Sequence, residues 1–166
     1  SMAKALKAYS DCTVYGWNRT ASIAEAALRE GAIDGIADDE ILSKCDLLLP
    51  ALFPQATIDF LRRVIPTMKP GAEVVDLVGV KSSVIQAVEP LALARGIRFT
   101  GGHPMAGLAK AGYERATADL YQGASMILVP TKATEEGDIA ELTRLFEQIG
   151  FGMVKVCDSE THDKMI

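Results

Sequence analysis

The sequence predicts an α/β fold built on a doubly wound, Rossmann-like and mostly parallel sheet. Short apolar segments alternate with amphipathic segments of helical period along all 166 residues, and glycine or proline turns separate them. This alternation requires crossover connections, which place helices on both faces of a parallel sheet. Since no repeat or linker interrupts the pattern, residues 1–166 are expected to form one domain.

Composition and charge exclude several classes of protein. Hydrophobic residues make up 49% of the chain and charged residues 23%, which is typical of a folded globular domain. The net charge of −5 and the lack of a basic run argue against a nucleic-acid partner, and no apolar run is long enough to cross a bilayer. Cys12, Cys45 and Cys157 lack the spacing of a metal site or a disulfide framework. We therefore expect a cytoplasmic protein with free thiols and no bound metal.

In the first half, helical period and turn residues define the elements. Ser22 and Glu25 have the spacing of a capping box, and Asp38 is placed to cap a short helix. The apolar run at 46–49 is typical of a strand buried on both faces. The expected elements are a helix over 2–9, a strand near 13–16, a helix ending at Gly31, a short helix ending at Leu42, a strand over 46–49 and a helix over 58–68.

In the second half, Ser82 or Ser83 is expected to cap a helix that ends at Gly96, and Pro90 predicts a kink or break near Glu89. Asp158 or Ser159 is expected to cap a final helix. The other expected elements are strands over 73–78, 97–100, 124–129 and 152–156 and a helix over 134–148.

The two ends of the sequence differ from those of a complete dinucleotide-binding fold. Such a fold begins with a strand and a GxGxxG turn whose amides hold the pyrophosphate at a helix N-terminus. Here the first predicted element is a helix, and none of the 14 glycines forms that pattern. We therefore expect the first strand to lie upstream or to be missing from this fold, and the chain stops at the start of a helix.

The segment after the second strand of such a fold reads the ribose of the adenosine. An acidic residue at that point selects NAD, but this chain has Asn18, Arg19 and Thr20. Because a guanidinium suits a phosphate, these residues favour NADP over NAD without excluding NAD. The alternative is a helix-capping turn with an exposed arginine.

Two further segments follow expected strands. Ala51 and Leu52 lie in a proline-flanked loop that could let a ligand approach the backbone, although a plain strand-to-helix turn has the same residues. After the strand over 73–78, Gly79 and Lys81 could supply a close backbone approach and a donor. The alternative for Lys81 is a solvated side chain beside a capping serine.

The most specific pattern is GGHPMAG at 101–107. Histidine titrates near neutral pH and is the commonest general acid or base. Pro104 restricts the backbone of His103, and the flanking glycines are expected to leave space for a ligand. A purely structural histidine is the alternative. The second histidine, His162, precedes Asp163, which could orient it, and we expect it on the surface at a helix start.

Taken together, these motifs resemble the prephenate/arogenate dehydrogenase family. The resemblance lies in GGHPMAG at 101–107, DLVGVK at 76–81, ADL at 118–120 followed by Gly123, and His162-Asp163, in matching order along the whole chain. Family members have an N-terminal nucleotide-binding domain and then a helical domain that dimerises and completes the substrate site. The resemblance implies that this chain lacks the first strand and that helical domain, and that alone it is inactive.

The resemblance also implies a reaction and roles. The family oxidatively decarboxylates prephenate to 4-hydroxyphenylpyruvate for tyrosine biosynthesis, or acts on arogenate, with hydride transfer to NAD or NADP. His103 would be the catalytic acceptor of the substrate hydroxyl proton. The vicinity of substrate and nicotinamide would comprise Gly79, Lys81, Gly102 and Pro104. The cofactor-binding residues would be Ser1, Asn18, Arg19, Thr20, Ala51, Leu52 and Val78.

The chain departs from the family pattern at two positions. Gly79 stands where many members have a serine beside the histidine, and Ala109 stands where some have a glutamate. Two other readings stay open. One is a β-hydroxyacid-dehydrogenase-like reductase, which shares the residues 18–20 but does not explain GGHPMAG. The other is a non-catalytic nucleotide-binding module.

Overall fold

The computed structural model describes residues 1–110 and 112–166. The helices of this part are α1 (Met2–Tyr9), α2 (Ala21–Arg29), α3 (Asp39–Lys44), α4 (Pro54–Val64), α5 (Ser82–Arg95), α6 (Asp138–Gln148) and α7 (Ser159–Met165), with 3-10 turns at Ile65–Thr67 and Tyr113–Arg115. The strands are β1 (Tyr15–Gly16), β2 (Gly35–Ile36), β3 (Leu47–Leu48), β4 (Glu73–Asp76), β5 (Arg98–Pro104), β6 (Ser125–Pro130) and β7 (Met153–Val156).

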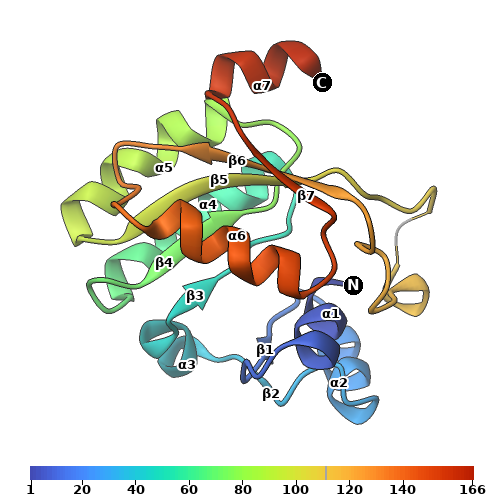
Figure 1. Ribbon diagram of the computed structural model, residues 1–166. Helices are drawn as coiled ribbons and strands as arrows, with labels where there is room; N and C mark the ends of the chain where they lie inside the picture. The colour runs from blue at the N-terminus through green and yellow to red at the C-terminus, as the bar shows by residue number, and fades with distance from the viewer. Residues whose placement is uncertain (111) are drawn as a thin grey trace.

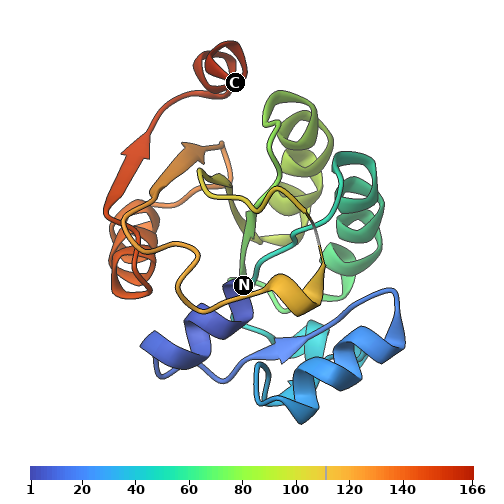
Figure 2. The same cartoon turned by 90° about the vertical axis from the view of Figure 1, so that its right-hand side faces the viewer.

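Five strands form the central sheet in the order β3-β4-β5-β6-β7. Neighbouring strands are parallel except β5 and β6, which are antiparallel. Helices α4 and α5 cover one face of the sheet and α6 covers the other (Figures 1 and 2). The predicted doubly wound and mostly parallel α/β architecture is confirmed.

Strands β1 and β2 form a separate parallel pair, which lies with α1 and α2 beside the β3 edge of the main sheet (Figure 1). In the described part of the chain, no strand joins the two sheets. Strand β3 is therefore an edge strand, and Leu47 and Leu48 are only partly buried. The expectation of a strand buried on both faces was wrong for this reason. The two-residue strand β2 is too short to show a period, and the sequence did not predict it.

Two of the four predicted helix caps are confirmed, at Asp38 and Asp158, and two are wrong. The carboxylate of Asp38 accepts a hydrogen bond from the Ile41 N–H at 2.8 Å, and that of Asp158 accepts from the Thr161 N–H at 2.7 Å. Ser22 instead lies inside α2, whose N-cap is Thr20, so it cannot form the predicted capping box.

Helix α5 begins without a side-chain cap of its own. Its N-cap is Lys81, and the backbone N–H groups of Lys81 and Ser82 donate to the Asp163 carboxylate of α7 at 2.9 and 2.8 Å. Neither serine therefore has the predicted capping role. The helix is continuous through Pro90, so the predicted break is also wrong, and it ends at Gly96 with φ of 73° as expected.

The core consists of two apolar clusters. Phe99 and Leu61 belong to the cluster between the sheet and helices α4 and α5, and Phe146 and Met126 belong to the cluster beneath α6. All four side chains are fully buried. Among the described residues, no helix has both the length and the hydropathy needed to cross a membrane.

A cluster of three charged side chains lies at the amino ends of β4 and β5, where Glu73 and Arg98 are paired in register. The guanidinium of Arg98 is 2.5 Å from an Asp138 oxygen but 3.6 Å from Glu73. Within the described chain, the Oε1 atom of Glu73 is buried without a hydrogen-bond partner. Burial raises the pKa of Glu73 to about 7, with Arg98 opposing this shift and Asp138 adding to it.

This raised pKa makes stability depend on pH. Because the folded state holds the Glu73 proton up to about pH 7 and the unfolded state releases it near its ordinary pKa of 4.5, the contribution of Glu73 to stability falls as pH rises between these values. In urea unfolding at pH 5 and pH 8, we expect Glu73→Gln to remove roughly 1–3 kcal/mol of this loss. Glu147→Gln, at an exposed carboxylate of α6, is the control. An unchanged pH dependence in Glu73→Gln would contradict the assignment.

Candidate active site

His103 lies within strand β5 and not in a loop after it. The strand continues through the glycine pair to Pro104, and His103 is paired with Ile127 of the antiparallel strand β6. Pairing with β6 fixes the backbone at the carboxyl end of β5, and ligands of doubly wound sheets bind at this edge. The side chain is partly buried. The predicted position at the ligand edge is thus retained, but a strand holds it in place.

The glycines before His103 make room for protein atoms. A Cβ atom on Gly102 would lie 2.8 Å from Val75 Cγ1 and 2.9 Å from the Asp76 carbonyl oxygen, closer than real Cβ contacts come. A Cβ atom on Gly101 would lie 3.0 Å from Cδ of Lys81. The expectation that these glycines leave space for a ligand was therefore wrong, because β4 and the Lys81 stem already fill that space.

Lys81 is fully buried beneath β5. Its ammonium group donates to the Asp76 carboxylate and, at 2.6 Å, to the Gly102 carbonyl oxygen. Burial lowers the pKa of Lys81 and raises that of Asp76, and the attraction between the two groups opposes both shifts. Lys81 is thus neither a solvated side chain nor a free donor at the ligand edge. It anchors the backbone on which His103 stands.

Gly79 lies beside the His103 ring. A Cβ atom on Gly79 would be 3.6 Å from His103 Nε2, an ordinary van der Waals distance. The position therefore accepts a small side chain such as the serine of many family members. Within the described residues, no hydrogen bond engages Nε2, whereas Nδ1 lies 2.8 Å from His162 Nε2. The free nitrogen of His103 is the one beside Gly79.

His162 is fully buried, so the expectation of a surface position was wrong. Its Nδ1 atom is 2.8 Å from an Asp163 carboxylate oxygen, and Asp163 is held by the N-terminus of α5. This contact between α7 and α5 buries the ring against His103. Sequence reasoning missed the pair because 59 residues separate the two histidines; the only available signal was the adjacent His162-Asp163.

Burial and the nearby charges favour the neutral form of the His103 imidazole. Burial lowers the pKa of His103, and the nearby His162 and Lys81 lower it further. A neutral imidazole with one unengaged nitrogen is a hydrogen-bond acceptor and a base. The arrangement can therefore take a proton from a hydroxyl group placed above Gly79.

The residues expected at the cofactor lie around the start of α1 and the end of β1. Ser1 and Asn18 line the same cavity of about 150 Å³, together with Trp17. The Asn18 side chain accepts from the Thr20 N–H at 2.8 Å, which shapes the turn and leaves Arg19 exposed. The indole of Trp17 stacks on Phe60 of α4, with 5.3 Å between ring centroids.

The remaining expected cofactor residues follow β3 and β4. Ala51 is exposed and Leu52 partly buried between β3 and α4, while Val78 is buried directly after β4. Pro104 is partly buried at the end of β5. These positions lie at the carboxyl ends of neighbouring strands, but the cavity that Ser1 and Asn18 line does not include them.

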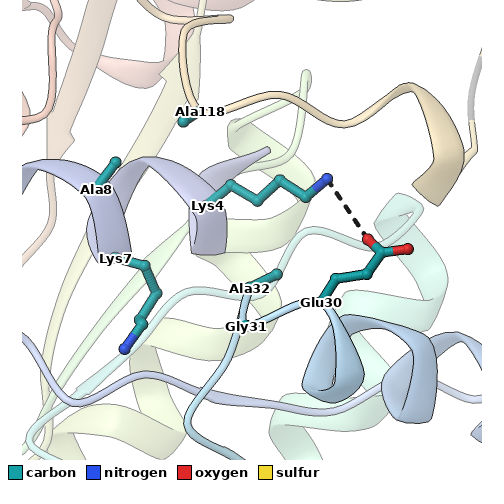
Figure 3. Close-up of a pocket in the computed structure, with 7 residues that line it drawn as sticks. All are labelled: Lys4, Lys7, Ala8, Glu30, Gly31, Ala32 and Ala118. Atoms are coloured by element: carbon teal, nitrogen blue, oxygen red, sulfur yellow. Dashed lines mark ion pairs between the residues drawn. The ribbon is translucent and has the colours of Figure 1, made fainter.

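A second cavity, of about 450 Å³, lies away from His103. It is lined by α1, by the end of α2 and by Ala118, and an ion pair of 3.9 Å between Lys4 and Glu30 crosses it (Figure 3). His103 does not line it. In the described ranges 1–110 and 112–166, no three His, Cys, Asp or Glu side chains are grouped as metal ligands.

Comparisons with known proteins identify relatives of this chain. Residues 2–155 match the family described as "Prephenate dehydrogenase, nucleotide-binding domain". Over 161 residues the chain is 26% identical to the prephenate dehydrogenase of Lactococcus lactis, covering 96% of this chain and 43% of that protein. It is 29% identical to the Bacillus subtilis prephenate dehydrogenase over 146 residues, which are 84% of this chain and 38% of that protein.

Solved structures agree with this relationship. Synechocystis arogenate dehydrogenase superposes with a TM-score of 0.89 at 27% identity, covering 99% of this chain and 58% of that one. The A. aeolicus prephenate dehydrogenase in complex with hydroxyphenyl propionate and NAD+ gives a TM-score of 0.87 at 27% identity, covering 98% and 57%.

The chain therefore spans about two fifths of the length of its curated relatives and over half of the solved ones. The match along nearly all of its residues, together with a strand-borne histidine at the ligand edge of the sheet, gives one conclusion. The chain belongs to the prephenate dehydrogenase nucleotide-binding domain family.

Proposed function

We propose that residues 1–166 are the NAD(P)-binding domain of a prephenate or arogenate dehydrogenase, with His103 as its catalytic base. The observation that carries this proposal is the state of His103. Its surroundings lower the pKa of the ring, its Nδ1 atom is engaged with His162, and its Nε2 atom faces the space beside Gly79. An enzyme that oxidises a hydroxyl group needs an acceptor of this kind for the proton.

In the proposed reaction a proton leaves the substrate hydroxyl, a bound nicotinamide would accept the hydride from the same carbon, and loss of carbon dioxide would then make the ring aromatic. His103 Nε2 accepts the proton. Lys81 holds the Gly102 carbonyl, so that the histidine does not shift as charge develops. The groups that bind the substrate carboxylates are not assigned to residues of this chain.

The cofactor is proposed to lie along Ser1, the turn at 18–20, Ala51, Leu52 and Val78. The A. aeolicus relative was solved with NAD+. In this chain Arg19 is exposed and no acidic residue stands in its turn, which favours the 2′-phosphate of NADP. We therefore propose NADP as the preferred cofactor and NAD as the alternative.

The family and the composition also suggest where the enzyme acts and which partners it has. We propose a cytoplasmic enzyme that acts on a small molecule, without a nucleic-acid partner, because the net charge is −5. The homodimer that the family resemblance implies would form through the helical domain of the whole enzyme. The β-hydroxyacid-type reductase is a weaker proposal, since it gives no role to the contact between His103 and His162.

The role of His103 is tested by His103→Asn in an enzyme of the relatives' length that contains this chain. An asparagine amide keeps a polar group of similar size but cannot accept the proton. We expect kcat for prephenate or arogenate to fall by about a hundredfold to ten-thousandfold.

The dissociation constant of the cofactor is the internal control and should stay within about twofold, since His103 lies away from the adenosine side. Turnover by His103→Asn at the original rate would remove the histidine from the mechanism. Activity of the parent enzyme on neither prephenate nor arogenate would refute the proposed function itself.

Cofactor preference is tested by Arg19→Ala in the same enzyme. Trp17, the one tryptophan of the chain, lies two residues away and reports binding by fluorescence. Loss of the guanidinium should weaken NADP by about tenfold and leave NAD nearly unchanged, because only NADP carries the 2′-phosphate.

Arg29→Ala removes another exposed arginine, at the far end of α2, and should change neither constant. Equal weakening of NAD and NADP by Arg19→Ala would contradict the phosphate role.

A further inference from the structure

The three side chains of Asp163, His162 and His103 form a continuous chain of hydrogen bonds that ends at the ligand edge of the sheet. Asp163 Oδ1 lies 2.8 Å from His162 Nδ1, and His162 Nε2 lies 2.8 Å from His103 Nδ1. The middle ring is fully buried. Each of the three engaged ring nitrogens faces one fixed partner, so the positions of the hydrogens can be assigned in turn.

The assignment starts at Asp163. Burial of this carboxylate acts to raise its pKa, but hydrogen bonds from Ser82, His162 and the Lys81 N–H outweigh burial and hold the pKa well below its usual range. The group is therefore an ionised carboxylate, which only accepts hydrogen bonds. His162 Nδ1 must then carry a hydrogen and donate it.

The hydrogen in the contact between His162 and His103 is placed in the same way. In the neutral form of the His162 ring, a hydrogen on Nδ1 leaves only a lone pair on Nε2. The short contact with His103 then requires that His103 Nδ1 carries the hydrogen. The remaining nitrogen, His103 Nε2, is left with a lone pair beside Gly79, at the carboxyl end of β5.

We infer that His162 and Asp163 are positioning residues for His103, which hold its imidazole in the tautomer whose Nε2 atom accepts a proton. The catalytic consequence rests on the function proposed above, while the tautomer is a property of the chain itself. When Nε2 takes the substrate proton, the imidazolium keeps its Nδ1–H bond to His162. The positive charge then faces Asp163 through the second ring.

The Asp163 carboxylate is itself held in place by the start of helix α5. The two oxygens accept from the first backbone N–H groups of α5, at 2.9 Å from Lys81 and 2.8 Å from Ser82. The side chain of the same Lys81 holds the Gly102 carbonyl next to His103. Both ends of the chain of hydrogen bonds are thus tied to the beginning of one helix, which keeps the two rings in register.

A purely structural role for His162, as a group that docks α7, makes a different prediction. It requires burial of the ring but places no hydrogen on a particular nitrogen of His103. Free imidazoles in water favour the tautomer with the hydrogen on Nε2, so an undirected His103 would show that form. The tautomer therefore separates the two roles.

The test is long-range ¹H–¹⁵N NMR on the 166-residue chain, labelled at histidine and measured near pH 8.5, about two units above the ordinary pKa of an imidazole. The chain has two histidines, and His103→Asn assigns the signals. We expect the Nδ1–H tautomer at both rings. A predominant Nε2–H tautomer at His103 would overturn the inference.

Two aspartate variants extend the test. Asp163→Asn replaces the obligate acceptor by an amide that can also donate, so His103 should shift toward the Nε2–H form. Asp158→Ala removes the N-cap side chain of the same helix but lies outside the chain of hydrogen bonds, and it should leave the tautomer unchanged. An equal shift in both variants would show that docking of α7, and not the carboxylate, sets the tautomer.

Kinetics of the parent enzyme give the second readout. His162→Leu fills the space but accepts no hydrogen bond, and kcat should fall at least about tenfold with the cofactor dissociation constant unchanged. His162→Gln, whose side-chain oxygen can accept from His103, should recover part of that loss. Full activity of His162→Leu would overturn the positioning role. The NMR result stands even if the parent enzyme acts on neither prephenate nor arogenate, so the two proposals fail separately.

Discussion

The carboxylate of Asp163 connects three parts of the molecule that are distant in sequence. It accepts from the first N–H groups of α5, from the ring of His162 on α7 and, through that ring, acts on His103 of β5. The N–H groups at the start of a helix need acceptors, and the positive end of the helix favours a negative one. Helix α5 has no side-chain cap of its own, so its structural need is met by the residue that also orients the candidate base.

A second buried contact, between Lys81 and Asp76, holds the β5 backbone next to His103. Lys81 and Asp76 bury an ion pair under β5, an arrangement whose desolvation offsets much of its attraction. The ion pair positions the backbone of β5 more than it stabilises the fold, since the ammonium group also holds the Gly102 carbonyl. The close contacts around Gly102 leave no space for any side chain there. Together they fix the strand backbone within the small tolerance that a proton transfer requires.

The sequence was sufficient for the architecture and for the place of His103 at the carboxyl end of a strand. Helical period and turns predicted the order of most elements, and the position of His103 after an apolar strand predicted its place at the sheet edge. The exact extent of β5 was not predictable, because glycines were read as loop residues although β6 pairs with them. The surroundings of His103 were missed for a related reason. Burial of His162 and Lys81 depends on contacts between α7, α5 and β5 that no local pattern records.

In the mechanism proposed above, Nε2 of His103 is the acceptor for the substrate hydroxyl. The most direct measurement is a crystal structure of the parent enzyme with cofactor and hydroxyphenyl propionate, the molecule bound in the A. aeolicus relative. We expect a phenolic oxygen about 2.6–3.2 Å from His103 Nε2, above Gly79, with Nδ1 still bonded to His162. A phenolic oxygen bound to other groups, with Nε2 facing protein or solvent, would contradict this mechanism.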